Sequence, residues 1–147
     1  MTVRKEGFPV NIARMSHDNK KELMVQFCIA YCGILSKHTV CATNRTGKLV
    51  AEATGLPVQL FLSHAHGGSQ QIGARISYEE IDMVIFFNDP HSNELDDDLN
   101  YIAKLCDQHN VPIATNAATA EMLIHGLARG DLDWRDIINP KKTPLKV

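Results

Sequence analysis

Apolar positions along the chain recur with two different periods, and the two periods predict alternating strands and helices. Short apolar runs predict five strands, at 10–15, 39–42, 58–62, 83–87 and 112–115. The run Met83–Phe87 (MVIFF) is apolar throughout, as is typical of a strand that helices cover on both faces. Apolar residues spaced three or four apart predict helices at 21–35, 47–54, 70–79, 97–109 and 118–129.

Strands that alternate with helices predict an α/β fold with one parallel sheet. We expect a three-layer, doubly wound, predominantly parallel five-stranded sheet. Right-handed crossovers place every strand-to-helix loop at the same edge, where ligands bind in such folds. A chain of 147 residues suits one domain, so we expect a single domain over 1–147. Its core would span about 10–127, and a C-terminal tail of about 131–147 would dock through Trp134.

Composition excludes several classes of protein. The net charge of -2 argues against binding to nucleic acid or to an acidic membrane surface, because both need a basic patch. No apolar run approaches the roughly 20 residues of a membrane span. The N-terminus lacks the apolar core of a signal peptide, so we expect a cytoplasmic protein. The four cysteines lack zinc-site spacing and are interpreted as small core residues: Cys28, Cys32, Cys41 and Cys106.

Each predicted strand is followed by a polar loop, and the five loops should meet at one edge of the sheet. Their sequences are SHDNK, TNRTG, SHAHGGSQQIGAR, NDPHSNELDDD and TNAAT, which begin at Ser16, Thr43, Ser63, Asn88 and Thr115. Convergence of five polar loops indicates a binding site more strongly than any single loop does.

The loop TNRTG has the features of a phosphate cradle. Thr43 and Thr46 offer hydroxyl groups, and the helix that follows presents backbone N–H groups to an anion. Asn44 tolerates a left-handed backbone, and Arg45 and Lys21 could contact phosphate directly. The alternative is that Thr46 only caps the helix and that Arg45 is a solvated surface residue.

Acidic residues and a histidine occupy two of the other loops. His17 could donate to a substrate oxygen, and Asp18 could orient it or accept a proton. Asp18 could equally cap the first helix, and Asp89 before Pro90 could simply favour a turn. Acidic residues at 96–98 precede a helix, as any helix N-terminus prefers.

Five segments, in this order and at this spacing, resemble the methylglyoxal synthase family. They are SHDNKK, ATNRTG, GGSQQIGARI, DMVIFFNDP and VPIATNAATAE, and the resemblance extends from about Val10 to about Leu127. It implies a flavodoxin-like architecture and conversion of dihydroxyacetone phosphate to methylglyoxal and phosphate through an enediolate. It also implies no metal or organic cofactor, and a homo-oligomer, commonly a hexamer. Related domains regulate carbamoyl phosphate synthetase, so the fold alone does not settle the function.

The resemblance also implies roles for individual residues. His17 would face the substrate oxygens beside Asp18, and Asp89 and Asp98 match acidic residues of the family's site. His91 is the nearest candidate for a second substrate-contacting histidine. The positions that would hold or border the phosphate are Lys21, Thr43, Asn44, Arg45, Thr46, Ser63, His64, Gly67 and Gly68.

The chain departs from the family at the position of the catalytic base. The family has a carboxylate after the paired glycines, where this chain has Ser69, and a serine hydroxyl is not ionised near neutral pH. One hypothesis is a synthase whose base is Asp18, Asp89, Asp98 or His66. A second is a non-catalytic phosphate-binding or regulatory domain, and a third is an oligomeric scaffold. Arg45 replaces a small hydroxyl residue, which suggests a cradle for more negative charge.

Overall fold

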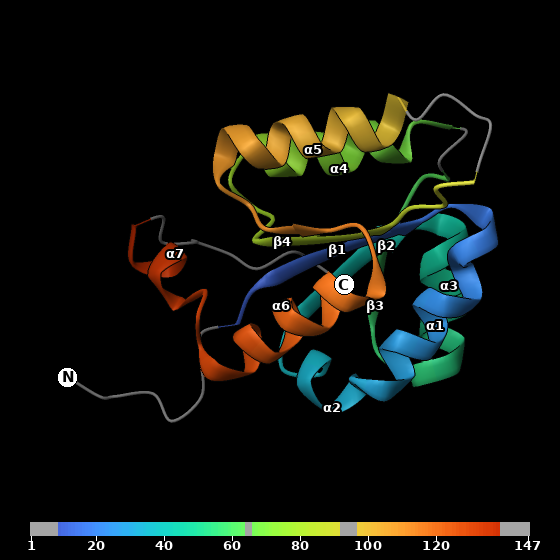
Figure 1. Ribbon diagram of the computed structural model, residues 1–147, viewed down its shortest axis with the longest axis horizontal. Coiled ribbons are helices and arrows are strands. Elements are labelled where there is room, and N and C mark those ends of the chain that lie inside the picture. The colour runs from blue at the N-terminus through green and yellow to red at the C-terminus, as the bar shows by residue number, and fades with distance from the viewer. Residues whose placement is uncertain (1–8, 64–65, 92–96, 139–147) are drawn as a thin grey trace.

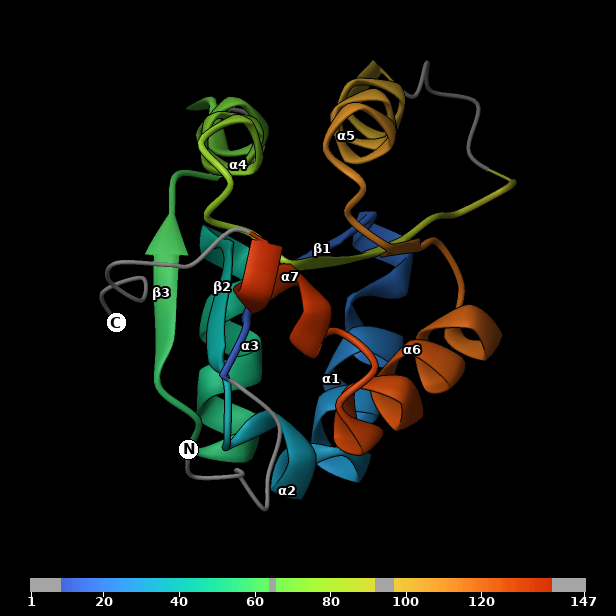
Figure 2. The same cartoon turned by 90° about the vertical axis from the view of Figure 1, so that its left-hand side faces the viewer.

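A parallel β-sheet lies between two layers of helices (Figures 1 and 2). The computed structural model describes residues 9–63, 66–91 and 97–138. The strands pair in the order β3-β2-β1-β4-β5, and every pair is parallel. This confirms the α/β, doubly wound fold class. Their bounds are β1 Asn11–Ser16, β2 Thr39–Thr43, β3 Val58–Phe61, β4 Met83–Phe87 and β5 Ile113–Ala114.

The helices divide unequally between the two faces of the sheet. In Figures 1 and 2, α4 and α5 cover one face, and α1, α2, α3 and α6 cover the other. The chain changes face between β3 and α4, so the direction of winding reverses between β1 and β4. The helix bounds are α1 Lys21–Ala30, α2 Cys32–Leu35, α3 Asn44–Thr54, α4 Gly68–Ser77, α5 Asp97–His109, α6 Ala117–Arg129 and α7 Asp133–Ile138, with a 3-10 turn at Asp18–Lys20.

Two apolar cores follow from the alternation of side chains along each strand. Ile85 and Phe87 of β4 belong to the core beneath α1, α3 and α6, whereas Val84 and Phe86 belong to the core beneath α4 and α5. Every residue of β4 is buried, as its unbroken apolar run predicts. Cys28, Cys41 and Cys106 are buried and unbonded, in agreement with their interpretation as core residues. Burial raises the pKa of the Cys41 thiol to about 12.

Three of the predicted helices differ from the observed ones. The helix predicted over 70–79 spans Gly68–Ser77, so Ser69 lies in its first turn rather than in the preceding loop. The helix predicted over 21–35 is interrupted at Tyr31, and its remainder forms the short α2. The helix expected from Gly47 begins at Asn44, so most of TNRTG is the first turn of α3 rather than a loop. The left-handed backbone expected at Asn44 is therefore wrong. Thr43 precedes the helix with an extended backbone, which lets α3 start directly at the end of β2.

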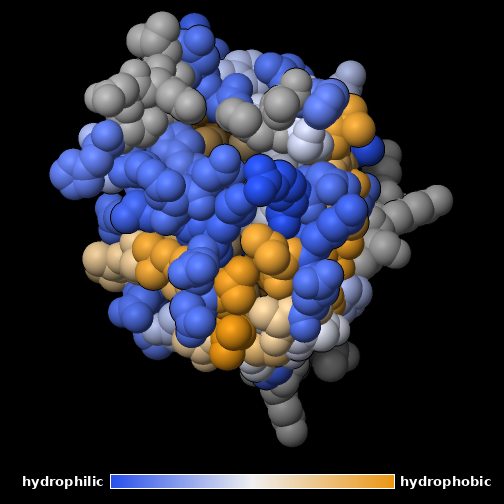
Figure 3. Space-filling view, turned by 90° about the vertical axis from the view of Figure 1, so that its right-hand side faces the viewer, coloured by the Kyte–Doolittle hydropathy of each residue, from blue (hydrophilic) through white to orange (hydrophobic). Residues whose placement is uncertain are grey.

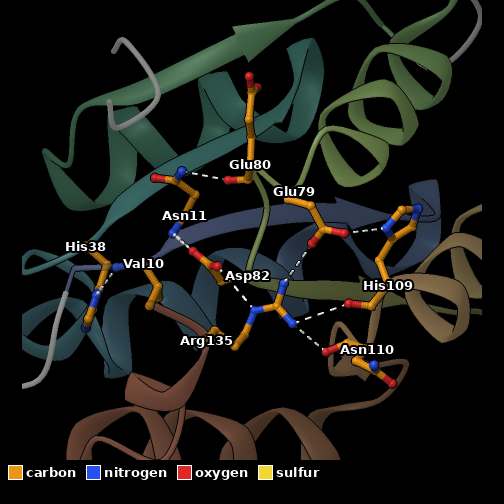
Figure 4. A network of polar contacts seen from close by, with 9 residues as sticks. All are labelled: Val10, Asn11, His38, Glu79, Glu80, Asp82, His109, Asn110 and Arg135. Carbon is orange, nitrogen blue, oxygen red and sulfur yellow. Dashed lines mark hydrogen bonds and ion pairs between the residues drawn. The ribbon is translucent and has the colours of Figure 1, made fainter. Parts of the chain in front are cut away.

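The C-terminal segment is fixed by a buried ionic network at the amino ends of the strands. Residues 133–138 form α7, where an irregular tail was expected. Trp134 keeps 44% of its surface exposed, whereas Arg135 keeps 4% and anchors the helix. Figure 4 shows the Arg135 guanidinium between Asp82 at 3.3 Å and Glu79 at 3.6 Å, and it also donates to the Asn110 carbonyl at 2.6 Å. None of the helices in the described ranges has the length and apolar content needed to cross a membrane.

Arg14 is a second buried arginine, and it lies within the sheet. It lies in the middle of β1, its side chain is fully buried, and burial lowers its pKa. None of its three guanidinium nitrogens has a hydrogen-bond partner within the described part of the chain. Because a buried charge without a partner costs several kcal/mol, Arg14 should reduce the stability of the fold.

We therefore expect Arg14→Met to stabilise the protein. Methionine keeps the unbranched stem and removes the buried charge, so the free energy of unfolding in urea should rise by about 1–4 kcal/mol. Lys48→Met removes an exposed cation and is the matched control, expected to change stability by less than about 0.5 kcal/mol. A loss of stability in Arg14→Met would contradict this account of the buried guanidinium.

His38 should make stability depend on pH. Its Nδ1 accepts a hydrogen bond from the Val10 N–H at 3.0 Å, and burial lowers its pKa below the ordinary 6.5. A depressed folded pKa means that the unfolded chain binds the proton first, so stability is full above about pH 6.5 and decreases as the pH falls toward 5. His38→Asn keeps an acceptor at the δ position without the titration. Urea unfolding at several pH values should therefore give a shallower pH dependence in the variant, and identical slopes would refute the assignment.

Candidate functional site

A cavity of about 700 Å³ lies at the carboxyl ends of the strands. Figure 3 looks onto this edge of the sheet, where hydrophilic side chains form a band across the middle of the face. The cavity is thus at the edge that the parallel topology predicted. Its walls are formed by Met15, Ser16, His17, Asp18, Asn19, Lys21, Thr43, Arg45, Thr46, Ser63, His66, Phe86 and Asp89.

His17 and Asp89 meet where the winding of the sheet reverses, between β1 and β4. The His17 N–H donates to the Phe87 carbonyl at 3.1 Å, which extends the strand pairing by one residue. The Asp89 N–H donates to His17 Nδ1 at 2.8 Å. Since Nδ1 accepts this bond, the proton of the neutral imidazole lies on Nε2. The ring also packs edge-on against Phe86, with centroids 5.5 Å apart. Both its tautomer and its orientation are therefore set by the ends of the two central strands.

The Asp89 carboxylate is held by two donors. The Asn19 side-chain amide donates to Oδ2 at 2.9 Å, and the His91 backbone N–H donates to Oδ1 at 3.0 Å. These bonds hold the pKa of Asp89 below its ordinary value. Asp89 is therefore ionised at neutral pH and is a weak proton acceptor.

Cations and hydroxyl groups also line the cavity. Thr46 lies in the first turn of α3, where backbone N–H groups lack intrahelical partners, and its hydroxyl lies 3.3 Å from Ser16 Oγ. Asp18 Oδ1 lies 3.2 Å from Lys21 Nζ and 3.7 Å from an Arg45 nitrogen. Two cations, hydroxyl groups and a helix N-terminus form a site that suits an oxyanion such as phosphate.

The glycine pair sets where α4 begins, next to Ser63 of the cavity wall. Gly67 has φ +98°, a backbone conformation that favours glycine, and it leads into α4. A Cβ on Gly68 would lie 2.0 Å from the Leu62 carbonyl oxygen and 3.0 Å from Thr43 Cγ2. The absence of side chains at the start of α4 thus lets this helix approach the end of β2.

Ser69 and Asp98 form a direct contact between α4 and α5. Ser69 Oγ donates to Asp98 Oδ2 at 2.9 Å, and the serine is fully buried. The two helices approach closely because the Tyr101 ring lies against Gly73, where a Cβ would come within 2.5 Å of the ring hydroxyl. Each of the paired residues is the second in its helix, where the helix dipole favours negative charge. A carboxylate from α5 therefore lies beside the position at which the sequence has a serine.

The structure brings together most of the site residues that the sequence indicated. Those that line the cavity are His17, Asp18, Lys21, Thr43, Arg45, Thr46, Ser63 and Asp89. Asn44, Gly67, Gly68, Ser69, His91 and Asp98 are not among its lining residues, although Gly68 and His91 contact residues that are. His64 and the tail beyond residue 138 lie outside the described residues.

Sequence reasoning missed two polar residues of the cavity. Ser16 and Asn19 belong to the loop SHDNK, and only their position beside His17 and Asp18 could have signalled them. Within the described ranges, no group of three His, Cys, Asp or Glu side chains is placed to hold a metal ion. The site can thus bind an oxyanion and present carboxylates and imidazoles to it.

Gly68→Ala should weaken anion binding. The added methyl group would collide with the Leu62 carbonyl, so the start of α4 must move away from Thr43. We expect titration calorimetry to show inorganic phosphate binding at least about tenfold more weakly, equivalent to about 1.4 kcal/mol. Gly33→Ala is the matched control, because a Cβ there meets nothing within 4 Å. Equal affinity in both variants would show that this approach is not needed for binding.

Comparisons with known proteins agree with this geometry. A family model described as MGS-like domain matches residues 24–115. The chain is 59% identical over 133 residues to the methylglyoxal synthase of Caldicellulosiruptor saccharolyticus, covering 90% of this chain and 94% of that protein. It is 49% identical over 134 residues to the methylglyoxal synthase of Oceanobacillus iheyensis, covering 90% and 96%. The crystal structure of methylglyoxal synthase from Elizabethkingia anophelis matches with a TM-score of 0.72 and 35% identity, covering 82% of this chain and 81% of that one.

Proposed function

Because the chain belongs to the methylglyoxal synthase-like family, we propose that it is a methylglyoxal synthase, a lyase that acts on dihydroxyacetone phosphate in this cavity. The observation that carries the proposal is the cavity itself. It brings an oxyanion cradle of Lys21, Arg45 and the α3 N-terminus into the same cavity as the joined pair of His17 and Asp89. The products are methylglyoxal and inorganic phosphate.

The phosphoryl group of the substrate binds in the cradle. Hydroxyl groups of Thr43, Thr46 and Ser63 line it, and Lys21 and Arg45 supply positive charge. Asp18 lies near both cations, so a bound phosphate would compete with its carboxylate for them. In this assignment Asp18 tunes the affinity for phosphate, and Lys21 contacts the phosphate directly.

His17 stabilises the oxygens of the enediolate. Its proton lies on Nε2, because Nδ1 accepts from the Asp89 N–H. A neutral imidazole whose orientation is fixed in advance can donate to a developing oxyanion without reorganising. Asp89 contributes by holding the loop that carries this N–H, since Asn19 and His91 both donate to its carboxylate.

Asp98 is the base that we assign in place of the missing carboxylate. The resemblance to the family puts the base at position 69, and Asp98 Oδ2 lies 2.9 Å from Ser69 Oγ. Asp98 is not among the residues that line the cavity, so the assignment requires the bound substrate to extend past the lining toward Ser69. There Asp98 removes a proton from the hydroxymethyl carbon, and the electrons of that bond form the enediolate. The enediolate then expels phosphate from the neighbouring methylene carbon, and the resulting enol becomes methylglyoxal. Asp89 is less suited because its pKa is lowered, and Asp18 because two cations face it.

Turnover of dihydroxyacetone phosphate by the purified protein tests the proposal, with methylglyoxal and phosphate both measured. We expect Asp98→Asn to lower kcat by about 10²-fold or more, because a positioned base contributes 10²–10⁴-fold. Ser69→Ala should lower kcat less, since it removes only the hydroxyl that orients the carboxylate. Asp97→Asn is the matched control, because Asp97 is exposed in the same turn of α5.

The outcomes separate the two candidate functions. If the unmodified protein binds inorganic phosphate but does not turn over the substrate, it is a binding or regulatory domain, as the serine at position 69 would favour. If it is active and Asp98→Asn is equally active, the base assignment is wrong while the enzyme assignment stands.

The remaining features of the proposal follow the family. The enzyme works in the cytoplasm without metal or organic cofactor, and it binds neither nucleic acid nor membranes. It assembles as a homo-oligomer, with a hexamer as the expected state. Exposed apolar side chains on several elements support assembly, among them Leu23, Leu49, Met122, Ile137 and Ile138.

A further inference from the structure

Ser63 and His66 form a hydrogen-bonded pair in the wall of the cavity. Ser63 Oγ lies 2.6 Å from His66 Nδ1, and both side chains line the cavity. The backbone fixes this arrangement, because the Ser63 carbonyl accepts from the His66 N–H at 2.9 Å and from the Gly68 N–H at 3.0 Å. The pair therefore lies directly before α4, and two backbone hydrogen bonds link Ser63 to His66 and Gly68. Neither residue has a role in proton abstraction in the function proposed above.

A phosphoryl group in the cavity decides which atom of the pair donates. A serine hydroxyl carries one proton. If Ser63 donates that proton to Nδ1, its lone pairs face the cavity and repel the phosphoryl oxygens. If His66 Nδ1–H donates to Ser63, the hydroxyl proton can point at a phosphoryl oxygen. An oxyanion in the cradle therefore selects the second arrangement, in which Ser63 and His66 form a chain of donors directed at the phosphate.

We propose that His66, acting through Ser63, supplies the proton that the phosphate takes up as it leaves. The proposal rests on the lyase function proposed above. When the carbon–oxygen bond breaks, its electron pair goes to the phosphate oxygen. That oxygen takes the Ser63 hydroxyl proton, and Ser63 takes the Nδ1 proton of a doubly protonated His66 ring, which is left as the neutral imidazole. The side chain of His66 is exposed, so its ring regains a proton from water.

In this proposal, different residues serve the two steps of the reaction. Asp98 and His17 serve formation of the enediolate, whereas Ser63 touches the leaving group and His66 is the positioning residue behind it. Histidine suits the role because it exchanges protons near neutral pH. Lys21 and Arg45 can offset the charge of the departing phosphate, but the proton prevents a further charge from developing on it.

Reaction in deuterium oxide tests the pair directly. An enediolate that fails to expel phosphate takes deuterium from solvent and returns to labelled substrate. The ratio of label in the remaining substrate to phosphate released therefore reports return of the enediolate to substrate relative to elimination of phosphate. We expect His66→Asn to raise this ratio at least about tenfold, because proton donation contributes at least that much to such steps. Ser63→Ala should raise it in the same direction.

His66→Asn is chosen because asparagine keeps an N–H donor at the δ position but supplies no transferable proton. A purely structural role would survive this change. His125→Asn is the matched control, since His125 is exposed on α6 and does not line the cavity. An unchanged ratio in His66→Asn overturns the inference. A fall of labelling and phosphate release in the same proportion overturns it as well, because the residue would then serve binding or shape.

A second measurement does not depend on turnover. Nitrogen-15 spectra of the imidazoles should show His66 Nδ1 become protonated when inorganic phosphate is added, and Ser63→Ala should abolish this change. If phosphate binds and Nδ1 stays unprotonated, the inference fails even in an active enzyme. If the unmodified protein neither labels nor cleaves the substrate, the proposed function fails, and the spectra still report whether the pair responds to phosphate.

Discussion

The hydrogen bond from the Asp89 N–H to His17 Nδ1 is the contact on which the geometry of the cavity depends. It joins the loops after β1 and β4, two neighbouring strands from which the chain winds in opposite directions. Loops at such a point diverge, and the space between them is the crevice in which open α/β sheets bind ligands. A single bond across that crevice fixes the ring of His17, the position of Asp89 and, through Asn19, the turn between β1 and α1.

The fold was largely predictable because each element carries its own local signal. The apolar run of β4 and the spacing in α5 predicted both elements at their observed bounds. The order of strands was not predictable in this way, because local periodicity does not say which strands are neighbours. The start of α3 was placed too late, since Asn44 and Gly47 resemble turn residues. Tyr31 interrupts a continuous apolar pattern, so the end of α1 gave no signal either.

The site was predictable as a group of loops but not as a set of bonds. A parallel sheet guarantees that the loops meet, which is why His17, Thr43 and Asp89 were found together. The bonds between Asn19 and Asp89 and between Ser69 and Asp98 depend on how neighbouring elements pack and on how far each side chain reaches. In the sequence, the serine at position 69 looked like the loss of the family's carboxylate, and the packing of α4 on α5 places the Asp98 carboxylate beside it.

Because of the ionic network around Arg135, the two ends of the sheet should differ in local stability. At the amino ends of the strands, the buried Asp82 carboxylate accepts from the Asn11 backbone N–H and from Arg135 Nε, and both of these residues are buried as well (Figure 4). Amide protons there should exchange with solvent only when the whole domain unfolds. At the opposite end, the amide of His66 lies in an exposed turn and should exchange through local opening. Ligand binding can therefore rearrange the residues of the cavity wall while the hydrogen bonds at the amino ends of the strands stay intact.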